Sequence, residues 1–579
     1  MDKSLEKVRH STAHILAIAI KELFPKAKLG MGPAIEEGFY YDFDNLTITE
    51  DSLKRIEKRM KQIIKQNLKF TKSKVPKANA KSLLKDEPYK LELLEDLTDK
   101  EISFYTSGEF KDLCKGPHVS STKNLKAFKL LSVAGAYWKG DSKNKMLTRI
   151  YGTAFKTEKE LTEYLVQKEE AEARNHIKLG KQLGIFTINK LVGKGLPLWL
   201  PKGNIIKEEV EKLAKEKETE AGYQRVTTPH IAKKELFLKS GHLPYYEEDM
   251  YPGMKMDDGV YFLRAMNCPE HHLIFKHQLR SYRDLPLRLA EYGTCYRNEL
   301  SGTLAGLLRV RMLSMNDAHI YCRKDQIEEE MKSVIKLTDD YYKIFGLGDY
   351  WFRLSLWGPK NKSKYINEPE NWKYSEETIR KVLKKLKVKF VEVEDEAAFY
   401  GPKLDVQFKA VTGREETLST TQLDFAAKTR FDLRYQDKNG EMNNEVFVIH
   451  RAPLSVHERF LAFLIEHYAG KFPLWLAPVQ IKLLSLTDRN AKHVEKLAKE
   501  FKKENLRVEL DTRSESMSKK VRDAQTELVP LILTIGDKEQ KANTLAIRTL
   551  DGKVKFGVKT KDFIKKVKTS VETRKDANI

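Results

Sequence analysis

Glu291-Tyr-Gly-Thr-Cys-Tyr-Arg-Asn-Glu299 is the stretch of sequence that most constrains the fold of this chain. It ends an extended segment, residues 287–298, which a Ser-Gly-Thr loop joins to a second extended segment, residues 307–322. Two such segments around a short glycine-containing loop predict a long antiparallel pair of strands. Arg297 on one strand and Arg309 on the other can then face each other and bind phosphate oxygens in bidentate fashion.

A second pattern that suits a nucleotide lies further along the chain. Residues 445–450 have the pattern of a strand, and residues 456–469 that of the helix after it, with Arg459 in its first turns. An arginine there can stack on a base or hold a terminal phosphate, and Glu299 can accept a hydrogen bond from an adenine amino group. Taken singly, these charged residues are better explained as solvated surface salt bridges.

The order of three segments changes that interpretation. Gly222-Tyr-Gln-Arg-Val-Thr-Thr-Pro229, then residues 291–299 with Arg309, then His450-Arg-Ala-Pro-Leu-Ser-Val-His-Glu-Arg459, resemble the three ordered motifs of class II aminoacyl-tRNA synthetases. The resemblance implies an antiparallel sheet flanked by helices and ATP bound with Mg²⁺ across its phosphates. It also implies a homodimer, with the first motif at its interface.

Three side chains from separate segments have the chemistry of a metal site. Cys268 in Met-Asn-Cys-Pro, His319 in Asn-Asp-Ala-His, and His450 offer three ligands, which leaves a fourth position open as in catalytic zinc sites. Each residue alone is more simply explained as a buried core residue. The three segments resemble those of threonyl-tRNA synthetases, in which one Zn²⁺ per subunit binds the amino and hydroxyl groups of threonine.

The resemblance also implies how threonine is chosen. Shape alone separates threonine weakly from isosteric valine, whereas a site that must coordinate an oxygen rejects valine strongly. The other positions of the family match receive the following roles. Asp317 accepts the threonine hydroxyl proton, Tyr400 contacts the amino group, Met266 and Gln422 line the pocket, Arg297 bridges the threonine carboxylate and the α-phosphate, Glu299 reads adenine, and Arg309 and Arg459 hold the distal phosphates.

Coordination of a hydroxyl by zinc cannot exclude serine, because serine also carries a hydroxyl. A further group of residues has the pattern of a second site. His10 and His14 share one face of the predicted opening helix, and Cys114-Lys-Gly-Pro-His118 supplies two similar groups. Spacing alone favours a second zinc site. The resemblance instead implies the editing domain of bacterial threonyl-tRNA synthetases, which hydrolyses mischarged seryl-tRNA, and we favour a metal-free, water-mediated reaction over a zinc-dependent one. The other residues that match this pocket are Asp112, Lys90 and Tyr41.

After Pro478 the sequence predicts strands at residues 480–486, 507–510, 531–535 and 545–549 and helices at 492–505 and 518–528, an alternation typical of a compact α/β domain. It resembles the anticodon-binding domain of the same family, whose base-reading positions match Arg522, Glu539 and Arg548. We therefore expect an α+β multidomain protein with a class II antiparallel sheet core, an α+β editing domain and a C-terminal α/β anticodon-binding domain. The predicted boundaries are 1–155 for the editing domain, 156–185 for a linker helix, 186–473 for the catalytic domain and 474–579 for the anticodon-binding domain.

Composition is compatible with tRNA(Thr) as a partner. Lys and Arg total 105 against 83 Asp and Glu in 579 residues, a formal net charge of +22, and cationic surfaces bind phosphate backbones by releasing counterions. A solubility device would give the same surplus, so charge alone does not decide. No segment has the ~18 apolar residues of a membrane helix, and four widely spaced cysteines do not suggest a disulfide framework. A cytoplasmic protein is expected.

The sequence departs from the family pattern at several positions. Leu313 stands where a phenylalanine usually stacks on adenine, Met315 replaces a glutamine near the threonine carboxylate, Ser455 replaces a glycine, and Glu416-Thr-Leu418 replaces Trp-Gln-Cys. A ubiquitin-like domain that usually comes first is expected to be missing, because the editing motif starts at His10. These changes spare the metal and phosphate residues, so they bear on affinity and turnover.

Two other functions fit the sequence less well. A paralogue that only hydrolyses or only binds tRNA would be expected to lack the activation residues, yet Arg297, Glu299, Arg309 and Arg459 are all present. A prolyl or seryl ligase shares the class II motifs but leaves the zinc ligands unexplained.

Overall fold

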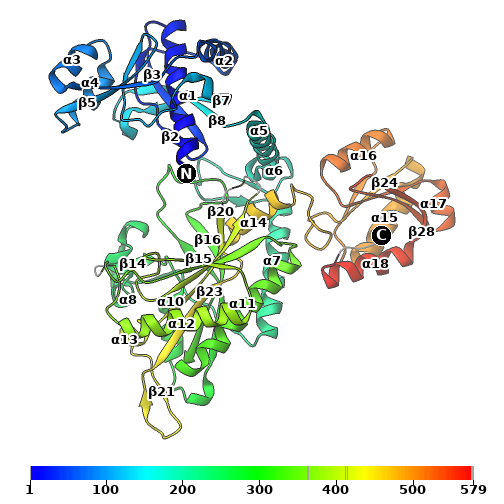
Figure 1. The fold of residues 1–579 in the computed structure, drawn as a ribbon. Coiled ribbons are helices and arrows are strands. Elements are labelled where there is room, and N and C mark those ends of the chain that lie inside the picture. The colour runs from blue at the N-terminus through cyan, green and yellow to red at the C-terminus, as the bar shows by residue number, and fades with distance from the viewer. Residues whose placement is uncertain (1, 142, 362–363, 411–412, 414, 576–579) are drawn as a thin grey trace. The chain divides into compact units, whose positions relative to one another are not determined.

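The computed structural model describes residues 2–141, 143–361, 364–410, 413 and 415–575 (Figure 1). The last positions of the predicted anticodon-binding domain, 576–579, lie outside the described residues. Contacts between Cα atoms divide the chain into two compact units, Met1–Glu169 and Glu170–Ile579. Over the described residues, none of the helices has both the length and the apolar character that crossing a membrane requires.

The first unit is built on a long helix and a five-stranded sheet. Helix α1 (Lys3–Leu23) begins where the Asp2 carboxylate accepts a hydrogen bond from the Ser4 amide, and it buries most of its residues from Val8 to Ile20. Together with α2 (Glu50–Lys65) it shares one hydrophobic core with the sheet. The strands, in the order β1-β3-β8-β7 with β2 paired to β3, are β1 (Lys28–Leu29), β2 (Ala34–Ile35), β3 (Gly38–Asp44), β7 (Ala127–Tyr137) and β8 (Met146–Phe155).

A smaller layer of the first unit contributes the other half of the candidate editing site. It is a three-stranded sheet in the order β4-β5-β6 with its own small core. Its elements are β4 (Thr71–Pro76), α3 (Lys77–Leu83), α4 (Pro88–Glu95), β5 (Glu101–Ser107) and β6 (Phe110–Leu113).

The predicted linker helix over 156–185 is two helices. Helix α5 (Glu158–Ala173) ends before Asn175, whose side chain accepts hydrogen bonds from the Ile177 and Lys178 amides and so caps a new helix, α6 (His176–Gln182). An asparagine cap satisfies the free amides of a helix start, and this is why one charged stretch forms two elements. The boundary between the two compact units also falls inside this stretch. The other domain boundaries remain predictions.

An eight-stranded sheet forms the centre of the second unit, in the order β11-β15-β16-β23-β20-β19-β17-β18. The predicted antiparallel pair is present, from Leu287 opposite Tyr321 to Tyr296 opposite Met312. Its second strand begins at Met312 and not at residue 307. The strands are β11 (Gln224–Arg225), β15 (Leu287–Tyr296), β16 (Met312–Arg323), β17 (Tyr350–Ser355), β18 (Phe390–Val393), β19 (Lys403–Lys409), β20 (Glu415–Asp424) and β23 (Val446–Ala452).

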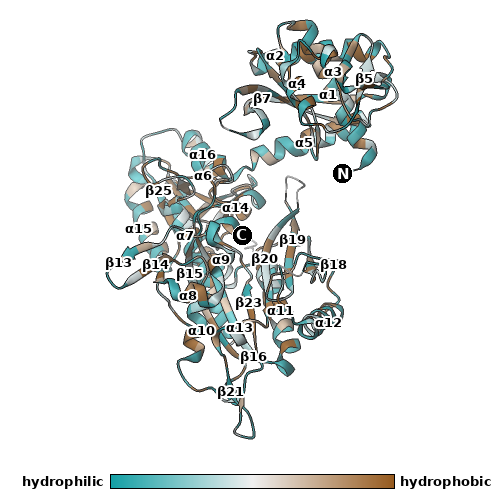
Figure 2. Ribbon diagram, turned by 90° about the vertical axis from the view of Figure 1, so that its left-hand side faces the viewer, coloured by the Kyte–Doolittle hydropathy of each residue, from teal (hydrophilic) through white to brown (hydrophobic). Residues whose placement is uncertain are grey.

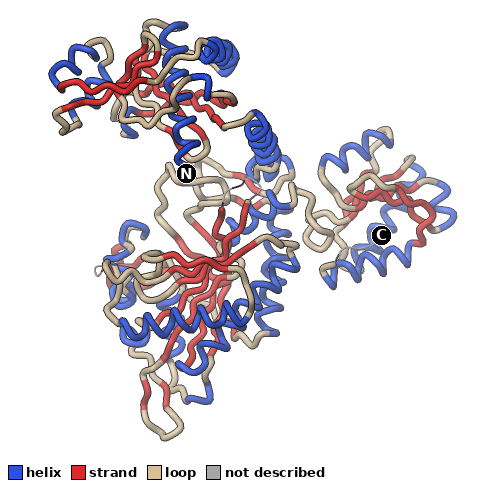
Figure 3. Tube along the Cα trace, in the orientation of Figure 1, coloured by secondary structure: helices blue, strands red, loops and turns tan. Residues whose placement is uncertain are grey.

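Helices lie along this sheet, as Figure 3 shows. Figure 2 shows hydrophobic and hydrophilic residues alternating along α12 (Pro369–Lys385), which buries Trp372, Ile379 and Val382 in the main core. The predicted helix after β23 is α14 (His457–His467). The remaining elements of this region are β9 (Phe186–Thr187), β10 (Leu198–Trp199), α7 (Pro201–Glu220), β12 (Ile231–Lys233), α8 (Lys234–Ser240), α9 (His242–Tyr245), β13 (Met254–Met256), β14 (Gly259–Leu263), α10 (Cys268–Lys276), α11 (Ile327–Ile344), α13 (Ala427–Phe431), β21 (Tyr435–Gln436) and β22 (Met442–Asn443).

A second sheet, of five strands in the order β25-β24-β26-β27-β28, forms the C-terminal part. The alternation predicted from sequence is present, with β24, β25 and β26 parallel and β27 and β28 antiparallel. The prediction missed β28, α17 and α18. The elements are β24 (Ile481–Ser485), α15 (Ala491–Lys503), β25 (Val508–Asp511), α16 (Met517–Thr526), β26 (Leu531–Ile535), α17 (Asp537–Ala542), β27 (Thr544–Thr549), β28 (Val554–Lys559) and α18 (Thr560–Thr573).

Candidate functional site

Neighbouring strands bring the predicted zinc ligands together. His319 on β16 lies opposite His450 on β23, and His450 lies opposite Gln422 on β20. Cys268 is the first residue of α10. One ligand atom from each of Cys268, His319 and His450 lies within 4.8 Å of the other two. The sheet register and the start of one helix thus build a three-residue cluster from segments far apart in sequence.

Each histidine of this cluster is held by a polar partner on its outer side. His450 Nε2 lies 3.0 Å from Asp424 Oδ2, and His319 Nδ1 lies 2.8 Å from His271 Nδ1. His271 Nε2 in turn lies 3.1 Å from Glu291 Oε2. Such contacts fix the ring orientation and leave the second nitrogen of each ligand histidine for a metal. Sequence reasoning did not identify Asp424, His271 or Glu291 as part of the site.

The donor set fits zinc. Burial raises the pKa of the Cys268 thiol well above its usual value and lowers the pKa of His319 well below its own. A neutral imidazole is the form that binds a metal, and a coordinated thiol gives up its proton. Ligand bonds of about 2.0 to 2.3 Å place neighbouring donors about 3.5 Å apart around a tetrahedral ion, so a small inward movement of these side chains would complete the site.

The cluster opens into a cleft of about 360 Å³. Asp317 Oδ2 lies 4.0 Å from His319 Nε2, and the Tyr400 hydroxyl donates a hydrogen bond to Gln422 Oε1. The predicted residues that line the cleft are Met266, Cys268, Arg297, Asp317, His319, Tyr400, Gln422, His450 and Arg459. The fold therefore gathers most of the predicted activation residues around one space.

The sequence reasoning gave no role to four polar residues of the cleft, Tyr246, Lys403, Thr420 and Arg451. Lys403 lies opposite Gln422 in the sheet, and its ammonium is 3.1 Å from the carboxylate of Asp405. The signal for Lys403 was available, because it lies three residues after the predicted site residue Tyr400. Tyr246 lies in a loop after α9 and carried no comparable signal.

Of the predicted nucleotide residues, Arg297 and Arg459 line the cleft, whereas Glu299 and Arg309 do not. Arg309 Nε donates to Glu299 Oε2 at 2.7 Å, so these two residues form an ion pair. Arg459 Nε donates to the Leu308 carbonyl at 3.1 Å. Burial, followed by the repulsion of Arg297 and Arg309, lowers the pKa of Arg459 against the opposing attraction of Glu416. Cations held this close repel one another, and a bound polyphosphate would relieve that repulsion.

The departures from the family pattern have different structural consequences. Ser455 adopts φ 56°, in the left-handed region that favours glycine, and so the serine is strained where the family carries glycine. Leu313 is only 3% exposed and packs with Cys295 and Val310. It does not line the cleft, whereas Met315 does.

The second predicted cluster lies in the first unit. His10 and His14 project from α1, and Cys114 and His118 follow β6. Ligand atoms of all four lie within 4.8 Å of one another. Cys114 Sγ is 3.4 Å from His10 Nε2 and 3.2 Å from His118 Nε2, so these polar atoms are hydrogen-bonded to one another. Ser11, which sequence reasoning missed, places its hydroxyl 3.0 Å from His118 Nδ1.

A buried carboxylate borders this second cluster. Asp112 accepts hydrogen bonds from the Tyr41 hydroxyl at 2.8 Å and from Lys90 Nζ at 3.0 Å, and it lies 3.8 Å from His14 Nε2. Burial lowers the pKa of His14 well below its usual value, lowers that of His118 to about 2, and raises that of Cys114 to about 11. The imidazoles are therefore neutral, and a neutral imidazole can accept a proton from water.

The three predicted base-reading residues lie on different elements of the C-terminal sheet domain. Arg522 is on α16 and Arg548 on β27. Glu539 caps α17, because its carboxylate accepts a hydrogen bond from the Gly536 amide at 3.0 Å. No hydrogen bond or ion pair joins these three side chains within the described part of the chain, so the structure places them on one domain without forming a single pocket.

Three comparisons with known proteins agree with this arrangement. Residues 254–468 match the "tRNA synthetase class II core domain (G, H, P, S and T)", residues 475–570 the "Anticodon binding domain", and residues 102–151 the "Threonyl and Alanyl tRNA synthetase second additional domain". Among solved structures, the RNA-binding domain of threonyl-tRNA synthetase from Cryptosporidium parvum Iowa II matches with a TM-score of 0.64 and 31% identity over 68% of this chain and 98% of that one.

Curated relatives extend the match along the whole chain. The threonine–tRNA ligase of Oceanobacillus iheyensis is 47% identical over 99% of this chain and 90% of its own length. The threonine–tRNA ligase of Staphylococcus epidermidis is likewise 47% identical over 99% of this chain and 90% of its own length. With a class II core, an anticodon-binding domain and an editing-type domain in one polypeptide, the chain belongs to the threonine–tRNA ligase family.

Proposed function

We propose that this chain activates threonine with ATP, transfers it to the 3′ end of tRNA(Thr), and hydrolyses seryl-tRNA(Thr) formed in error. The observation that carries the proposal is the cluster of Cys268, His319 and His450 in one cleft with Asp317 and with Arg297 and Arg459. A metal-ligand set with an open position, next to arginines suited to phosphate, fits an amino acid with a second polar group and a nucleotide.

Activation requires the threonine carboxylate to attack the α-phosphate of ATP, with pyrophosphate leaving. In this proposal Arg297 orients the carboxylate and the α-phosphate, and Arg309 and Arg459 stabilise charge on the distal phosphates together with Mg²⁺. Positioning and preorganised charge supply most of the rate in such a reaction. The tRNA hydroxyl then attacks the threonyl carbonyl carbon and AMP leaves.

In this proposal threonine is selected because Asp317 and Tyr400, beside the cluster, bind its hydroxyl and amino groups. A Zn²⁺ held by Cys268, His319 and His450 would supply coordination for the amino and hydroxyl groups. Asp317 would accept the hydroxyl proton in a hydrogen bond, and Tyr400 would orient the amino group. Valine would leave that carboxylate unpaired and buried, at a cost of about 1–3 kcal/mol for the lost hydrogen bond alone.

Serine carries the same polar groups, so its removal is assigned to the first unit. There His14 would position or deprotonate a water molecule, with Asp112 on its outer side held by Lys90 and Tyr41. His10, Cys114 and His118 would form the wall of this pocket and need no metal for the reaction. The ester bond to serine would be cleaved by the water, with the tRNA hydroxyl as leaving group.

Several coarser expectations belong to the same proposal. The chain would act as a homodimer with residues 222–229 at the interface, and it would work in the cytoplasm with one Zn²⁺ per subunit. The domains would be 1–155 for editing, 186–473 for activation and 474–579 for anticodon binding, with Arg522, Glu539 and Arg548 reading bases.

The test is amino-acid-dependent exchange between ATP and pyrophosphate, with purified, zinc-replete protein and each standard amino acid. Exchange with threonine, weaker exchange with serine and negligible exchange with valine is the expected result. Exchange that is equal for threonine and valine would contradict selection through the hydroxyl. Absence of exchange with every amino acid would favour a chain that only binds or hydrolyses aminoacyl-tRNA.

A further inference from the structure

One aromatic side chain of the C-terminal sheet stands apart from the core. Phe556 on β28 is 76% exposed, the largest exposed fraction of any Phe, Tyr or Trp in the described part of the chain. β28 is the edge strand of its sheet (Figure 1). A single exposed apolar residue is common on protein surfaces, so the meaning of Phe556 depends on what surrounds it.

The sheet register places Phe556 on the same face as Arg548. One row of paired residues runs across the sheet from Lys482 through Ile532 and Arg548 to Val554. Side chains two residues apart on a strand share a face, so Phe556 lies on the face of Val554 and Arg548.

Helix α16 covers only part of that face. Its residue Ala524 packs in a small cluster with Leu484 of β24 and Ile532 of β26. No member of that cluster comes from β27 or β28 among the described residues. The face is therefore covered over β24 and β26, and Ala546 of β27 is buried as well, whereas Val554 and Phe556 of β28 are exposed.

A bulge shapes the edge strand at this point. Between the pairs Ile547–Lys555 and Leu545–Val558, Phe556 and Gly557 together oppose a single residue of β27. Gly557 has φ 69°, which a residue with a side chain adopts only with strain. Bulges of this type redirect a neighbouring side chain and end regular pairing, and here the bulge accompanies the exposed ring.

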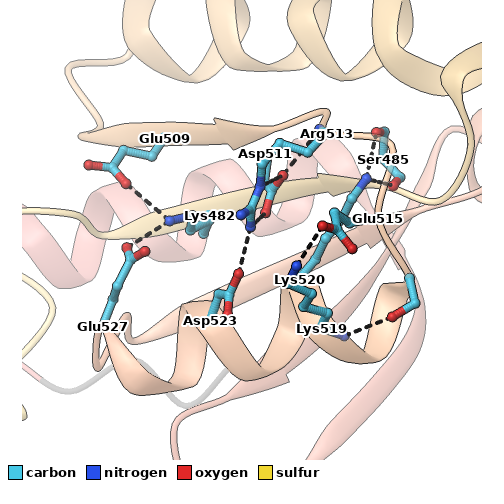
Figure 4. A network of polar contacts seen from close by, with 11 residues as sticks. Lys482, Ser485, Glu509, Asp511, Arg513, Glu515, Lys519, Lys520, Asp523 and Glu527 are labelled. Atoms are coloured by element: carbon cyan, nitrogen blue, oxygen red, sulfur yellow. Dashed lines mark hydrogen bonds and ion pairs between the residues drawn. The ribbon is translucent and has the colours of Figure 1, made fainter.

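Charge is distributed unevenly across the same face. Figure 4 shows that the cations over β24 and β25 are neutralised: Lys482 contacts Glu509 and Glu527, and Arg513 contacts Asp511 and Asp523. By contrast, neither Arg548 nor Lys559 forms an ion pair with any described residue. Lys559 lies opposite Thr544 and so shares the face of Arg548. This face of the sheet over β27 and β28 thus combines an exposed ring with two cations that carry no neutralising carboxylate.

We propose that Phe556 is a stacking platform for an unpaired base of the tRNA anticodon loop, with Arg548 and Lys559 on either side binding the backbone or base edges. Single-stranded RNA is the ligand that uses both features, since bases stack on exposed aromatic rings and phosphates bind nearby cations. The inference rests on the anticodon-binding role proposed for this domain. It adds a residue, and a type of contact, to the three positions expected from the sequence.

Binding of a labelled anticodon stem–loop of tRNA(Thr) to the full-length chain tests the inference. Phe556→Ala is expected to raise the Kd about tenfold, within the range measured for loss of one base–aromatic stack. Phe556→Trp is expected to keep the affinity, and Phe556→Leu to lose most of it, because leucine is apolar but has no π-face. Val391→Ala is the matched control. Val391 is an apolar residue, 45% exposed, on β18, an edge strand of the eight-stranded sheet.

The salt dependence separates stacking from charge. Phe556→Ala should leave the slope of log Kd against log salt unchanged, whereas Lys559→Ala should reduce it by about one phosphate contact, a slope change of about 0.7 for a single strand. Threonine-dependent ATP–pyrophosphate exchange should be equal in all variants and reports intact folding.

Two outcomes are distinct. If the unaltered chain binds the stem–loop no better than an unrelated hairpin, the anticodon-binding role itself fails. If it binds specifically and Phe556→Ala binds equally well, the stacking inference is overturned while that role stands.

Discussion

The two histidine–cysteine clusters of this chain, one in each compact unit, differ in whether their members are hydrogen-bonded to one another through the thiol. In the cluster of Cys268, His319 and His450, the hydrogen bonds of the histidines run outward, to His271 and to Asp424. In the cluster of residues 10, 14, 114 and 118, Cys114 is hydrogen-bonded to two of the histidines. Similar residue types at similar separations are therefore arranged for different purposes.

Outward contacts leave the inner lone pairs of a cluster free for one external ion. Inward contacts use those lone pairs within the protein, and a metal would have to break them. The carboxylate next to the second cluster, Asp112, is also held by Lys90 and Tyr41, so little of its charge remains to attract a cation. The comparison favours zinc in the catalytic cleft and metal-free chemistry in the first unit.

The largest effect is expected from removing the thiol of the cluster of Cys268, His319 and His450. Cys268→Ala should lower threonine-dependent ATP–pyrophosphate exchange at least 10³-fold and reduce bound zinc from one to none per chain, because two histidines hold the ion weakly. Cys114→Ala is the matched control and should retain both zinc and exchange. Metal analysis beside the exchange assay reads both quantities. Retained exchange in Cys268→Ala would remove the argument for zinc in the cleft.

The next largest effect is expected on hydrolysis by the cluster of residues 10, 14, 114 and 118. His14→Ala should slow seryl-tRNA(Thr) hydrolysis about 100-fold, within the usual range for loss of a general base, and leave exchange unchanged. Hydrolysis of pre-formed seryl-tRNA measures this directly. Treating the unaltered chain with a chelator should abolish exchange yet spare hydrolysis. Hydrolysis that is lost on chelation and restored by zinc would show that the comparison between the clusters is wrong.

Acidification should destabilise the first compact unit through its buried histidines. Burial lowers the folded-state pKa of His118 to about 2, so below about pH 6.5 the unfolded chain takes up a proton that the folded unit does not. Stability from this group is full above pH 6.5 and falls as the pH decreases, by about 2 kcal/mol between pH 7 and 5. Hydrogen exchange of amides in β7 and β8 measures it. His118→Asn should weaken this dependence, and an identical pH profile in that variant would contradict the assignment.

The smallest effect is expected in the loop beside the first cluster. Ser455→Gly should raise the free energy of unfolding by about 0.5 kcal/mol, since relief of the strain at φ 56° outweighs the added freedom of the unfolded chain. Ala469→Gly, at φ 51° just after α14, is the matched variant and should give a similar gain. Denaturant unfolding measures both. A loss of stability in Ser455→Gly would mean that the serine side chain contributes more than its strained backbone costs.

The sequence was sufficient for the parts of the fold with local signals. Periodicity and turn residues predicted the pair β15–β16, the strand–helix unit β23–α14 and, except for α17, the alternating elements from β24 to β27. The predicted helix over 156–185 was wrong because the cap at Asn175 is a local side-chain interaction that charge composition does not reveal. β28 was missed although its apolar residues Val554, Phe556 and Val558 alternate with Lys and Gly, and nearly all its residues are exposed.

The candidate sites show a similar division. Asp317 and Tyr400 were predicted from the family resemblance, and both line the cleft. Asp424, His271 and Ser11 were missed because their contribution is a contact to a ligand-type residue from another segment, and such contacts depend on packing. The packing of Leu313 against Val310 and its place outside the cleft lining were likewise not visible in the sequence.

The ion pair between Glu299 and Arg309 has a consequence for nucleotide choice. In the proposed roles one partner reads the adenine amino group and the other holds the distal phosphates, so ATP must separate them to bind. A ligand that offers only one of the two ends leaves an arginine or a carboxylate without its partner. With these roles, the ion pair would favour ATP, which has both the adenine base and the full triphosphate. AMP, GTP and free polyphosphate each lack one of these two features and would bind less well.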